Sequence, residues 1–339
     1  MKDIIIGKNF EEIEKIITDL KIPKYTTNQI FEWLYKKQVY SFDLMTNISK
    51  KHREILKEKF EFGLSKPVGV EISNDGTKKY LFRTKNNLFV ESAYIPDKDR
   101  ATLCLSTQVG CKMGCKFCMT GKQGFQANLT TDEILNQILS LPEKNLLTNL
   151  VFMGMGEPLD NYENLINTIK ILTSENAFAW SPKRITVSTI GIINELKKFI
   201  NDCSCHVAIS LHSPFENQRK ELMPVENSNP IKEVIEIVRS YNFSKQRRIS
   251  FEYILFKNFN DTQKHVKEIA KLLNGIRCRI NLIRFHPFPG APFQTSDEIS
   301  IVNFKNELQR KGFITTIRAS RGFDISAACG LLSTKKNIL

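Results

Sequence analysis

From about residue 102 onward, short apolar and β-branched stretches alternate with segments of helical periodicity. The predicted strands are 103–106, 149–153, 184–188, 206–210, 249–254 and 279–283. Helical sequence follows each of them, and the clearest helix begins at the capping-box pattern Thr130–Glu133 and runs to Leu141. Because parallel strands need a crossover connection, repeated strand–helix units imply a parallel sheet. The expected fold is therefore α/β, a full or partial (β/α) barrel whose site lies at the carboxyl ends of its strands.

Two smaller units precede this region. Residues 1–62 are predicted to form a small helical domain, because apolar residues recur at helical spacing from Phe10 to Leu20 and again after Thr26-Thr27, a candidate N-cap. Residues 63–100 hold three short β-like runs broken by turn sequences, which indicates a β meander that links the helical domain to the barrel. The barrel core and a C-terminal segment are expected to occupy residues 101–339.

The stretch Cys111-Lys-Met-Gly-Cys115-Lys-Phe-Cys118 places three cysteines close together, shortly after the first predicted strand. Three thiolates can hold an iron–sulfur cluster and leave one of its four irons open to a substrate or cofactor. Zinc is a second interpretation, but zinc favours four ligands, and residues 121–202 supply no second Cys-x2-Cys pair. Cysteines also occur as small buried apolar residues. The spacing favours the three-cysteine cluster over both alternatives.

Glycine-rich or polar sequences follow the next three predicted strands. Gly154-Met-Gly-Glu-Pro158 comes after the second strand, Ser188 ends the third, and Ser210-Leu-His212 ends the fourth. The glycines let the backbone approach a ligand, and the glutamate can accept a hydrogen bond from an ammonium group. Taken singly, each sequence could be a tight turn or a structural histidine. Together, at one edge of a parallel sheet, they predict a small-molecule site.

The charge balance indicates a polyanionic partner. The net charge is +13, and basic residues concentrate at 50–53, 245–248, 277–284 and 318–321. Such an excess favours nucleic acid, because each neutralised phosphate releases counterions. The N-terminus lacks an apolar signal segment, and no apolar run reaches the ~20 residues of a membrane-spanning helix. We therefore expect a cytoplasmic protein without a membrane segment, whose cysteines are reduced, metal-bound or catalytic.

The three-cysteine loop followed by the Gly-Glu-Pro sequence resembles the radical S-adenosylmethionine superfamily. The resemblance narrows to the RlmN family of dual-specificity RNA adenine-C2 methyltransferases and covers nearly the whole chain. The segments that carry it are 106–111, 123–125, 154–159, 222–225, 287–290 and 321–330. It implies a partial (β/α) barrel core and an N-terminal helical domain that binds RNA. It also implies methylation of C2 of adenosine 2503 in 23S rRNA and of adenosine 37 in tRNAs.

The resemblance also implies roles for individual residues. Cys111, Cys115 and Cys118 would hold a [4Fe-4S] cluster, whose open iron binds S-adenosylmethionine. Cys329 would carry the methyl group as S-methylcysteine, Cys104 would release the RNA by a transient disulfide with Cys329, and Glu91 would be the proton acceptor. The implied cofactor contacts are Gly156, Glu157, Ser188, Ser210, Leu211, His212 and His286.

The family's reaction implies two cofactor molecules per turnover and a set of partners. One S-adenosylmethionine methylates Cys329, and a second yields the 5′-deoxyadenosyl radical that activates this methyl group. Such a relay suits adenine C2, which is neither nucleophilic nor acidic, because a radical can add there. The implied partners are 23S rRNA, tRNA and a one-electron reductant of the flavodoxin or ferredoxin type, and a monomer is expected.

Two rival functions and two departures from the family pattern stay open at this point. The sister family methylates C8 of the same rRNA adenine, but it typically has Ala where this chain has Pro158. A non-catalytic iron–sulfur RNA-binding protein would need neither Cys104 nor Cys329. His286 stands where many members have asparagine, and Phe323 stands where an acidic residue is common.

Overall fold

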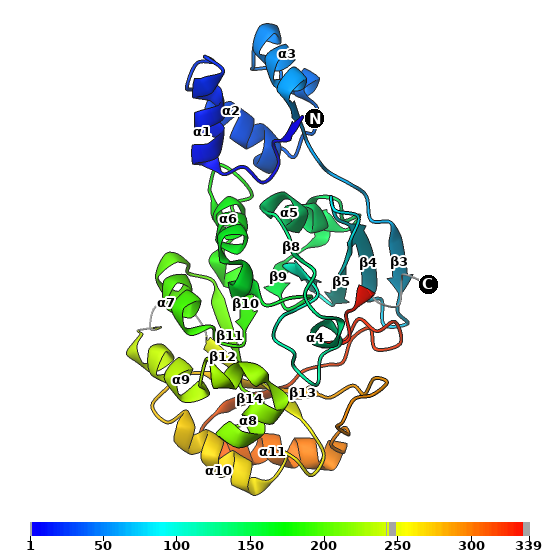
Figure 1. Ribbon diagram of the computed structural model, residues 1–339, viewed down its shortest axis with the longest axis vertical. Coiled ribbons are helices and arrows are strands. Elements are labelled where there is room, and N and C mark those ends of the chain that lie inside the picture. Colours follow the sequence, from blue (N-terminus) through cyan, green and yellow to red (C-terminus); the bar gives the residue numbers. More distant parts are fainter. Residues whose placement is uncertain (1, 242, 244–248, 335–339) are drawn as a thin grey trace.

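The computed structural model describes residues 2–241, 243 and 249–334, and its centre is one open ten-stranded sheet (Figure 1). The strand order is β14-β13-β12-β11-β10-β9-β6-β5-β4-β3, and the strands from β6 to β14 run parallel. The strands are β3 (Gly69–Ile72), β4 (Lys78–Arg83), β5 (Phe89–Asp97), β6 (Arg100–Cys104), β9 (Asn149–Phe152), β10 (Ile185–Thr189), β11 (His206–Ser210), β12 (Ile249–Leu255), β13 (Arg279–Arg284) and β14 (Ile314–Ile317). Since β3 and β14 do not pair with each other, the barrel is partial, as predicted.

Helices connect the parallel strands and cover the outer face of the sheet. They are α5 (Thr131–Leu139), α6 (Tyr162–Thr173), α7 (Ile193–Asp202), α8 (Glu216–Leu222), α9 (Ile231–Ser240), α10 (Gln263–Leu272) and α11 (Glu298–Arg310), with one-turn 3-10 segments at Lys144–Leu146, Pro158–Asn161, Pro182–Arg184 and Pro224–Asn227. The predicted capping box is present at α5, where the Glu133 carboxylate accepts from the Thr130 amide at 2.9 Å. Among the described residues, no helix combines the length and the apolar character that a membrane crossing requires.

Side chains alternate along the strands between the core and the barrel interior. In β10, Ile185 and Val187 are fully buried in the core, whereas Thr186 and Ser188 face the interior cavity. This alternation follows from the two-residue period of a strand. Polar residues at alternate strand positions therefore gather inside the barrel.

The N-terminal helices form a narrower lobe at one end of the molecule (Figure 1). The lobe contains α1 (Phe10–Asp19), α2 (Thr26–Phe31), a π-helical turn at Glu32–Lys36, a 3-10 turn at Phe42–Leu44 and α3 (Lys50–Lys59). A short parallel pair, β1 (Asp3–Ile4) with β2 (Phe60–Glu61), joins the two ends of the lobe. The predicted N-cap at Thr26-Thr27 was wrong, because α2 begins at Thr26 itself, and both threonines are buried within the first turn.

The predicted meander continues the barrel sheet rather than standing beside it. Strands β3, β4 and β5 pair antiparallel in sequence order, and β5 pairs antiparallel with β6. The boundary expected at residue 100 therefore falls at the start of β6, inside the continuous sheet.

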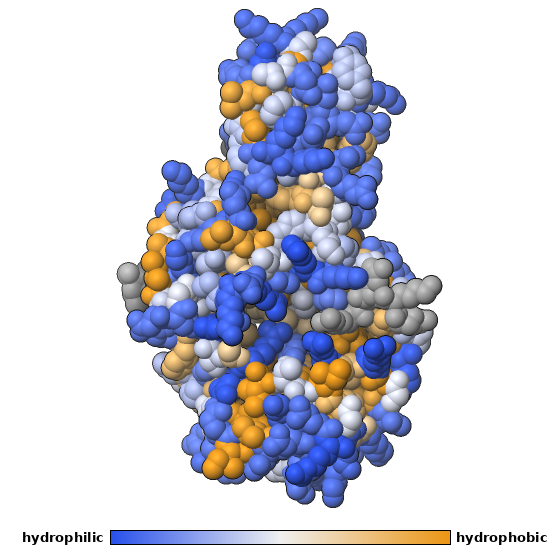
Figure 2. Space-filling model, turned by 180° about the vertical axis from the view of Figure 1, so that it is seen from behind, coloured by the Kyte–Doolittle hydropathy of each residue, from blue (hydrophilic) through white to orange (hydrophobic). Residues whose placement is uncertain are grey.

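The basic cluster expected at 245–248 lies outside the described residues. The face shown in Figure 2 is largely hydrophilic, with separate hydrophobic patches.

Candidate active site

The inward faces of the strands enclose a cavity of about 630 Å³, which we call the lumen. Its wall includes strand-end residues from β6, β9, β10, β11, β12 and β13 together with the loop that carries the three cysteines. The sequence-predicted residues on this wall are Cys104, Cys111, Cys115, Cys118, Gly156, Glu157, Ser188, Ser210, His212, His286 and Cys329. Leu211 and Glu91 do not lie on it. The fold thus brings together most of the residues that the sequence singled out.

A short strand pair shapes the cysteine loop. Strand β7 (Gln108–Val109) pairs antiparallel with β8 (Ala127–Asn128), and the loop and helix α4 (Met119–Gln123) lie between them. The Cys118 amide donates to the Cys115 carbonyl at 3.1 Å, which closes the turn between the second and third cysteines. All three thiols are half-buried and line the lumen.

The three thiols line one cavity, and burial raises the pKa of two of them. Burial raises the pKa of Cys111 to about 12, and the nearby Cys118 also raises it. Burial likewise raises the pKa of Cys115 well above its ordinary value, with further contributions from Cys118 and Cys111. Within the described part of the chain, no three His, Cys, Asp or Glu side chains meet closely enough to hold one metal ion. A cubane cluster binds each thiolate through a different iron, so three thiols that face one cavity without converging on a single point fit it.

Close packing explains the glycines of the Gly154–Pro158 turn. A Cβ atom at Gly154 would lie 2.5 Å from Ser106 Oγ, and one at Gly156 would lie 2.5 Å from Gln108 Cβ. Gly156 also has φ +98°, a conformation that other residues rarely adopt. The turn therefore requires glycine at both positions and brings bare backbone to the lumen wall.

Glu157 sits at this turn with its carboxylate almost fully enclosed. Thr189 Oγ1 donates to one carboxylate oxygen, and the Ile190 amide donates to the other at 3.0 Å. Burial raises the pKa of Glu157 to about 7, although these hydrogen bonds act in the opposite direction. A positively charged ligand group in the lumen would favour its ionised form.

The third and fourth strand ends supply hydroxyl and imidazole groups. Ser188 in β10 and Ser210 in β11 are half-buried on the lumen wall. The Nδ1 atom of His212 accepts from the Ile254 amide at 3.1 Å, which places the imidazole proton on Nε2. Burial lowers the pKa of His212 to about 3, and the charge of Arg219 adds to this shift. His212 is therefore a neutral hydrogen-bond donor.

A buried ion pair supports the ends of β10 and β11 on the side away from the lumen. Arg219 in α8 is completely buried and forms an ion pair with Glu226. Its guanidinium also donates to the carbonyls of Ile190, Ser210 and Leu211 at 3.0–3.2 Å. Leu211 is fully buried, and its amide donates to the Glu252 carbonyl at 3.0 Å. Sequence patterns did not predict this arginine, because its partners come from three separate segments.

Hydrogen bonds to the cysteine loop and α4 hold the C-terminal segment over the lumen. The Met119 amide donates to the Gly330 carbonyl at 2.7 Å, and Thr120 Oγ1 donates to the Leu332 carbonyl at 2.7 Å. The Thr334 amide donates to Gln123 Oε1 at 3.0 Å. These contacts explain how Cys329, distant in sequence, comes to the cavity that contains the three cysteines.

Cys329 and Cys104 share the lumen with a charged pair. Burial raises the pKa of Cys104 to about 12, and the nearby Cys329 also raises it. Arg318 lowers the pKa of both thiols, although burial keeps that of Cys329 above its ordinary value. Arg318 is held by Glu252 at 3.2 Å and donates to Met153 Sδ at 3.4 Å. The single acidic residue within the apolar strand Ile249–Leu255 was the sequence signal for this pair.

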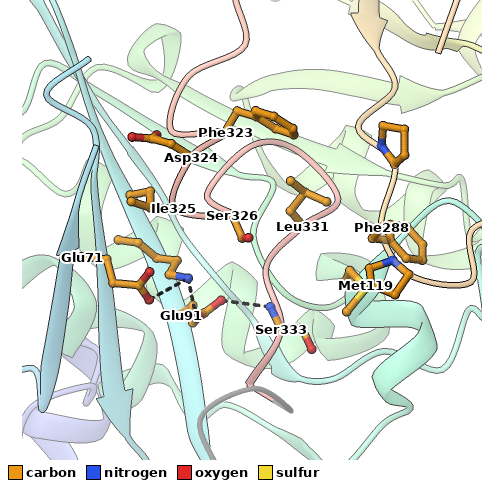
Figure 3. A pocket seen from close by; sticks show the side chains of 13 residues that line it. Glu71, Glu91, Met119, Phe288, Phe323, Asp324, Ile325, Ser326, Leu331 and Ser333 are labelled. Atoms are coloured by element: carbon orange, nitrogen blue, oxygen red, sulfur yellow. Dashed lines mark hydrogen bonds and ion pairs between the residues drawn. The ribbon is translucent and has the colours of Figure 1, made fainter. Parts of the chain in front are cut away.

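Glu91 faces a second, smaller cavity (Figure 3). Its carboxylate accepts from the Ser333 amide at 2.9 Å and pairs with Lys79 at 3.2 Å. It is 1% exposed and does not line the lumen. The role of Glu91 as proton acceptor therefore stays a prediction.

His286 lies at the edge of the lumen. Its Nε2 atom forms a hydrogen bond with Ser320 Oγ at 2.9 Å, and its ring stacks on Phe323. Burial lowers the pKa of His286, and Arg284 adds to this effect, which favours the neutral ring. Its contact with the cofactor stays a prediction.

Two family models match the chain. The model described as the radical SAM superfamily matches residues 105–273, and the model described as the ribosomal RNA large subunit methyltransferase N-terminal domain matches residues 5–62. The first match spans the cysteine loop and the strand ends of the lumen. The second coincides with the N-terminal lobe.

Similar proteins cover nearly the whole chain. A probable dual-specificity RNA methyltransferase RlmN from Phocaeicola vulgatus is 56% identical, over 99% of this chain and 96% of its own length. The dual-specificity RNA methyltransferase RlmN of Syntrophus aciditrophicus is 44% identical, over 96% of this chain and 95% of its own. The crystal structure of a radical SAM methyltransferase from Sphaerobacter thermophilus superposes with a TM-score of 0.90 at 36% identity, covering 97% of this chain and 99% of that one.

Proposed function

The chain belongs to the RlmN family of the radical SAM superfamily, and from this premise we propose that it methylates C2 of adenosine in 23S rRNA and tRNA. It is an RNA methyltransferase whose cofactors are a [4Fe-4S] cluster and S-adenosylmethionine. The family's targets, adenosine 2503 of 23S rRNA and adenosine 37 of tRNAs, are the expected substrates. The single observation that carries the proposal is that Cys104 and Cys329 face the same cavity as the three-cysteine loop.

Cys111, Cys115 and Cys118 are the proposed cluster ligands, since their thiols line one end of the lumen as a set. When bound there, the cluster supplies the electron that cleaves S-adenosylmethionine to a 5′-deoxyadenosyl radical. The surrounding chain would orient the cofactor. The bare backbone at Gly156 leaves room for it, Ser188 and Ser210 offer hydroxyl groups, and the carboxylate of Glu157 suits its ammonium group.

Cys329 is the proposed methyl carrier. Its thiol is exposed to the lumen, where a sulfonium methyl group could be transferred to it, leaving S-adenosylhomocysteine. Transfer of the methyl group to sulfur requires the thiolate; burial raises the pKa of Cys329, and the charge of Arg318 acts against this and favours the thiolate. Cys104 is the proposed partner that releases the methylated RNA by forming a disulfide with Cys329.

RNA and a reductant are the proposed partners. The +13 charge favours a polyanion, and the lobe at residues 5–62 matches a ribosomal RNA methyltransferase domain. The target adenine would have to leave its stack to enter the lumen, as in other enzymes that modify bases. We further propose a cytoplasmic monomer that receives electrons from a small flavodoxin or ferredoxin.

The test is the identity of the product. The gene is expressed in a host that lacks adenine C2 methylation, and the rRNA and tRNA are digested to nucleosides and separated by mass spectrometry. The proposal predicts 2-methyladenosine. Accumulation of 8-methyladenosine would show that the enzyme methylates C8, as the sister family does, and not C2. The absence of both methylated nucleosides would support a non-catalytic RNA-binding protein.

A further inference from the structure

Phe323 is a large aromatic residue that the active site does not use, yet its ring is fixed in position. The side chain is 53% exposed. The ring stacks on His286, with centroids 4.7 Å apart and planes inclined by 32°. Ser320 holds the imidazole in turn, through its Oγ at 2.9 Å from Nε2. An exposed ring supported in this way loses little side-chain conformational entropy when a planar ligand stacks on it.

The same ring lines the cavity of about 380 Å³ shown in Figure 3. Phe288 lines this cavity as well. The segment that carries Cys329 separates the cavity from the lumen, because Ile325 and Leu331 belong to the wall of the cavity whereas Cys329 belongs to the wall of the lumen. The two cavities are therefore neighbours, on either side of this segment.

The charges of this cavity select against phosphate. Among the described residues, three carboxylates line it, those of Glu71, Glu91 and Asp324, and one ammonium group does, that of Lys79. Lys79 pairs with Glu71 at 2.9 Å and with Glu91 at 3.2 Å, so within the described part of the chain the carboxylates of this cavity outnumber its ammonium group. Such a pocket repels a phosphate group but suits an uncharged base whose amino group can donate to a carboxylate.

We propose that this cavity binds an unpaired nucleobase that flanks the target adenosine, and that Phe323 is the stacking platform for that base. The inference rests on the proposed RNA substrate and adds a second base-binding site to it. Aromatic stacking contributes enough per base for the loss of Phe323 to weaken RNA binding by about 5- to 150-fold.

The test is a double-mutant cycle that combines protein variants with altered RNAs, using RNA hairpins that present an unpaired adenosine. Affinity is measured by fluorescence anisotropy at one fixed salt concentration, because salt alone changes RNA affinity strongly. Each flanking nucleotide is replaced in turn by an abasic residue, and the protein is either wild type, Phe323→Ala or Phe323→Trp. With the intact RNA, Phe323→Ala is expected to bind at least about 5-fold more weakly, whereas Phe323→Trp retains the affinity.

The abasic RNAs separate stacking from damage to the fold. If the platform exists, Phe323→Ala and wild type bind one of the two abasic RNAs equally well. An equal loss of affinity on all RNAs, or no loss on any, overturns the proposal. Methylation by the wild type is assayed in parallel. Methylation without this coupling refutes the platform alone, whereas no 2-methyladenosine from any RNA refutes the proposed function.

Discussion

Removing the guanidinium of Arg219 should destabilise the protein and its cofactor site together. In Arg219→Met, the Glu226 carboxylate stays 1% exposed without its counter-charge, and the carbonyls of Ile190, Ser210 and Leu211 lose a donor. Removing one partner of a buried ion pair lowers the free energy of unfolding by about 3–5 kcal/mol. We expect a loss of that size in the free energy of unfolding.

The assay is urea denaturation of four proteins: wild type, Arg219→Met, Glu226→Gln and the double variant. Neutralising Glu226 removes the unpaired charge, so the double variant should be more stable than the sum of the single losses predicts, by more than about 1 kcal/mol. Arg310→Met is the matched control. Arg310 pairs with Glu307 on the surface, where such pairs contribute about 0–1 kcal/mol.

Two results would refute this reasoning. One is a loss in Arg219→Met no larger than that in Arg310→Met, which would mean that the buried guanidinium is replaceable by an apolar chain. The other is strict additivity of the two single losses, which would mean that Arg219 and Glu226 do not stabilise each other. The affinity of S-adenosylmethionine, measured by calorimetry, should fall in Arg219→Met, because the freed carbonyls belong to the strand ends of the lumen.

Three further predictions concern single residues. Gly156→Ala should lower the free energy of unfolding by about 1–3 kcal/mol more than Gly124→Ala in urea denaturation, since both glycines have positive φ but only the first lacks space for a Cβ; equal losses would contradict the packing argument. Burial raises the pKa of Glu157 to about 7, so the folded state binds more protons than the unfolded state between about pH 4.5 and 7. The free energy of unfolding of the wild type, relative to that of Glu157→Gln, should therefore fall as pH rises through that window. If the two proteins show the same pH dependence, the pKa is not raised. Cys329→Ala should abolish methylation but leave RNA affinity within about 2-fold, by product analysis and anisotropy; continued methylation would rule out the cysteine relay.

Local patterns predicted the elements of this fold well where one short segment determines the outcome. The capping box at α5 and the parallel strands from β9 to β13 depend on periodicity and capping within a few residues, and the structure confirms them. The strand predicted at 103–106 overlaps only the end of β6 (Arg100–Cys104). The edge strand β14 was missed, because Ile314–Ile317 is short and half polar. The N-cap at Thr26-Thr27 was wrong, since both threonines lie inside α2, which follows Tyr25 and has no side-chain cap.

The site was predictable where its residues sit at strand ends and not where they meet across the barrel. Glu157 and His212 follow strands, so fold class alone places them at the lumen. The pairs Arg219–Glu226 and Arg318–Glu252 join separate elements through tertiary packing, which spacing does not encode. The orientation of the Glu91 side chain toward the smaller cavity also involves a distant partner, because its carboxylate accepts from the Ser333 amide.

The most direct test is the chemical state of Cys329 after one half of the reaction. Protein reconstituted without oxygen is incubated with S-adenosylmethionine that carries a deuterated methyl group, in the absence of RNA, and its peptides are analysed by mass spectrometry. We predict one labelled methyl group on the Cys329 sulfur and none on Cys104. An unmodified Cys329 in protein that nevertheless methylates RNA would contradict the account.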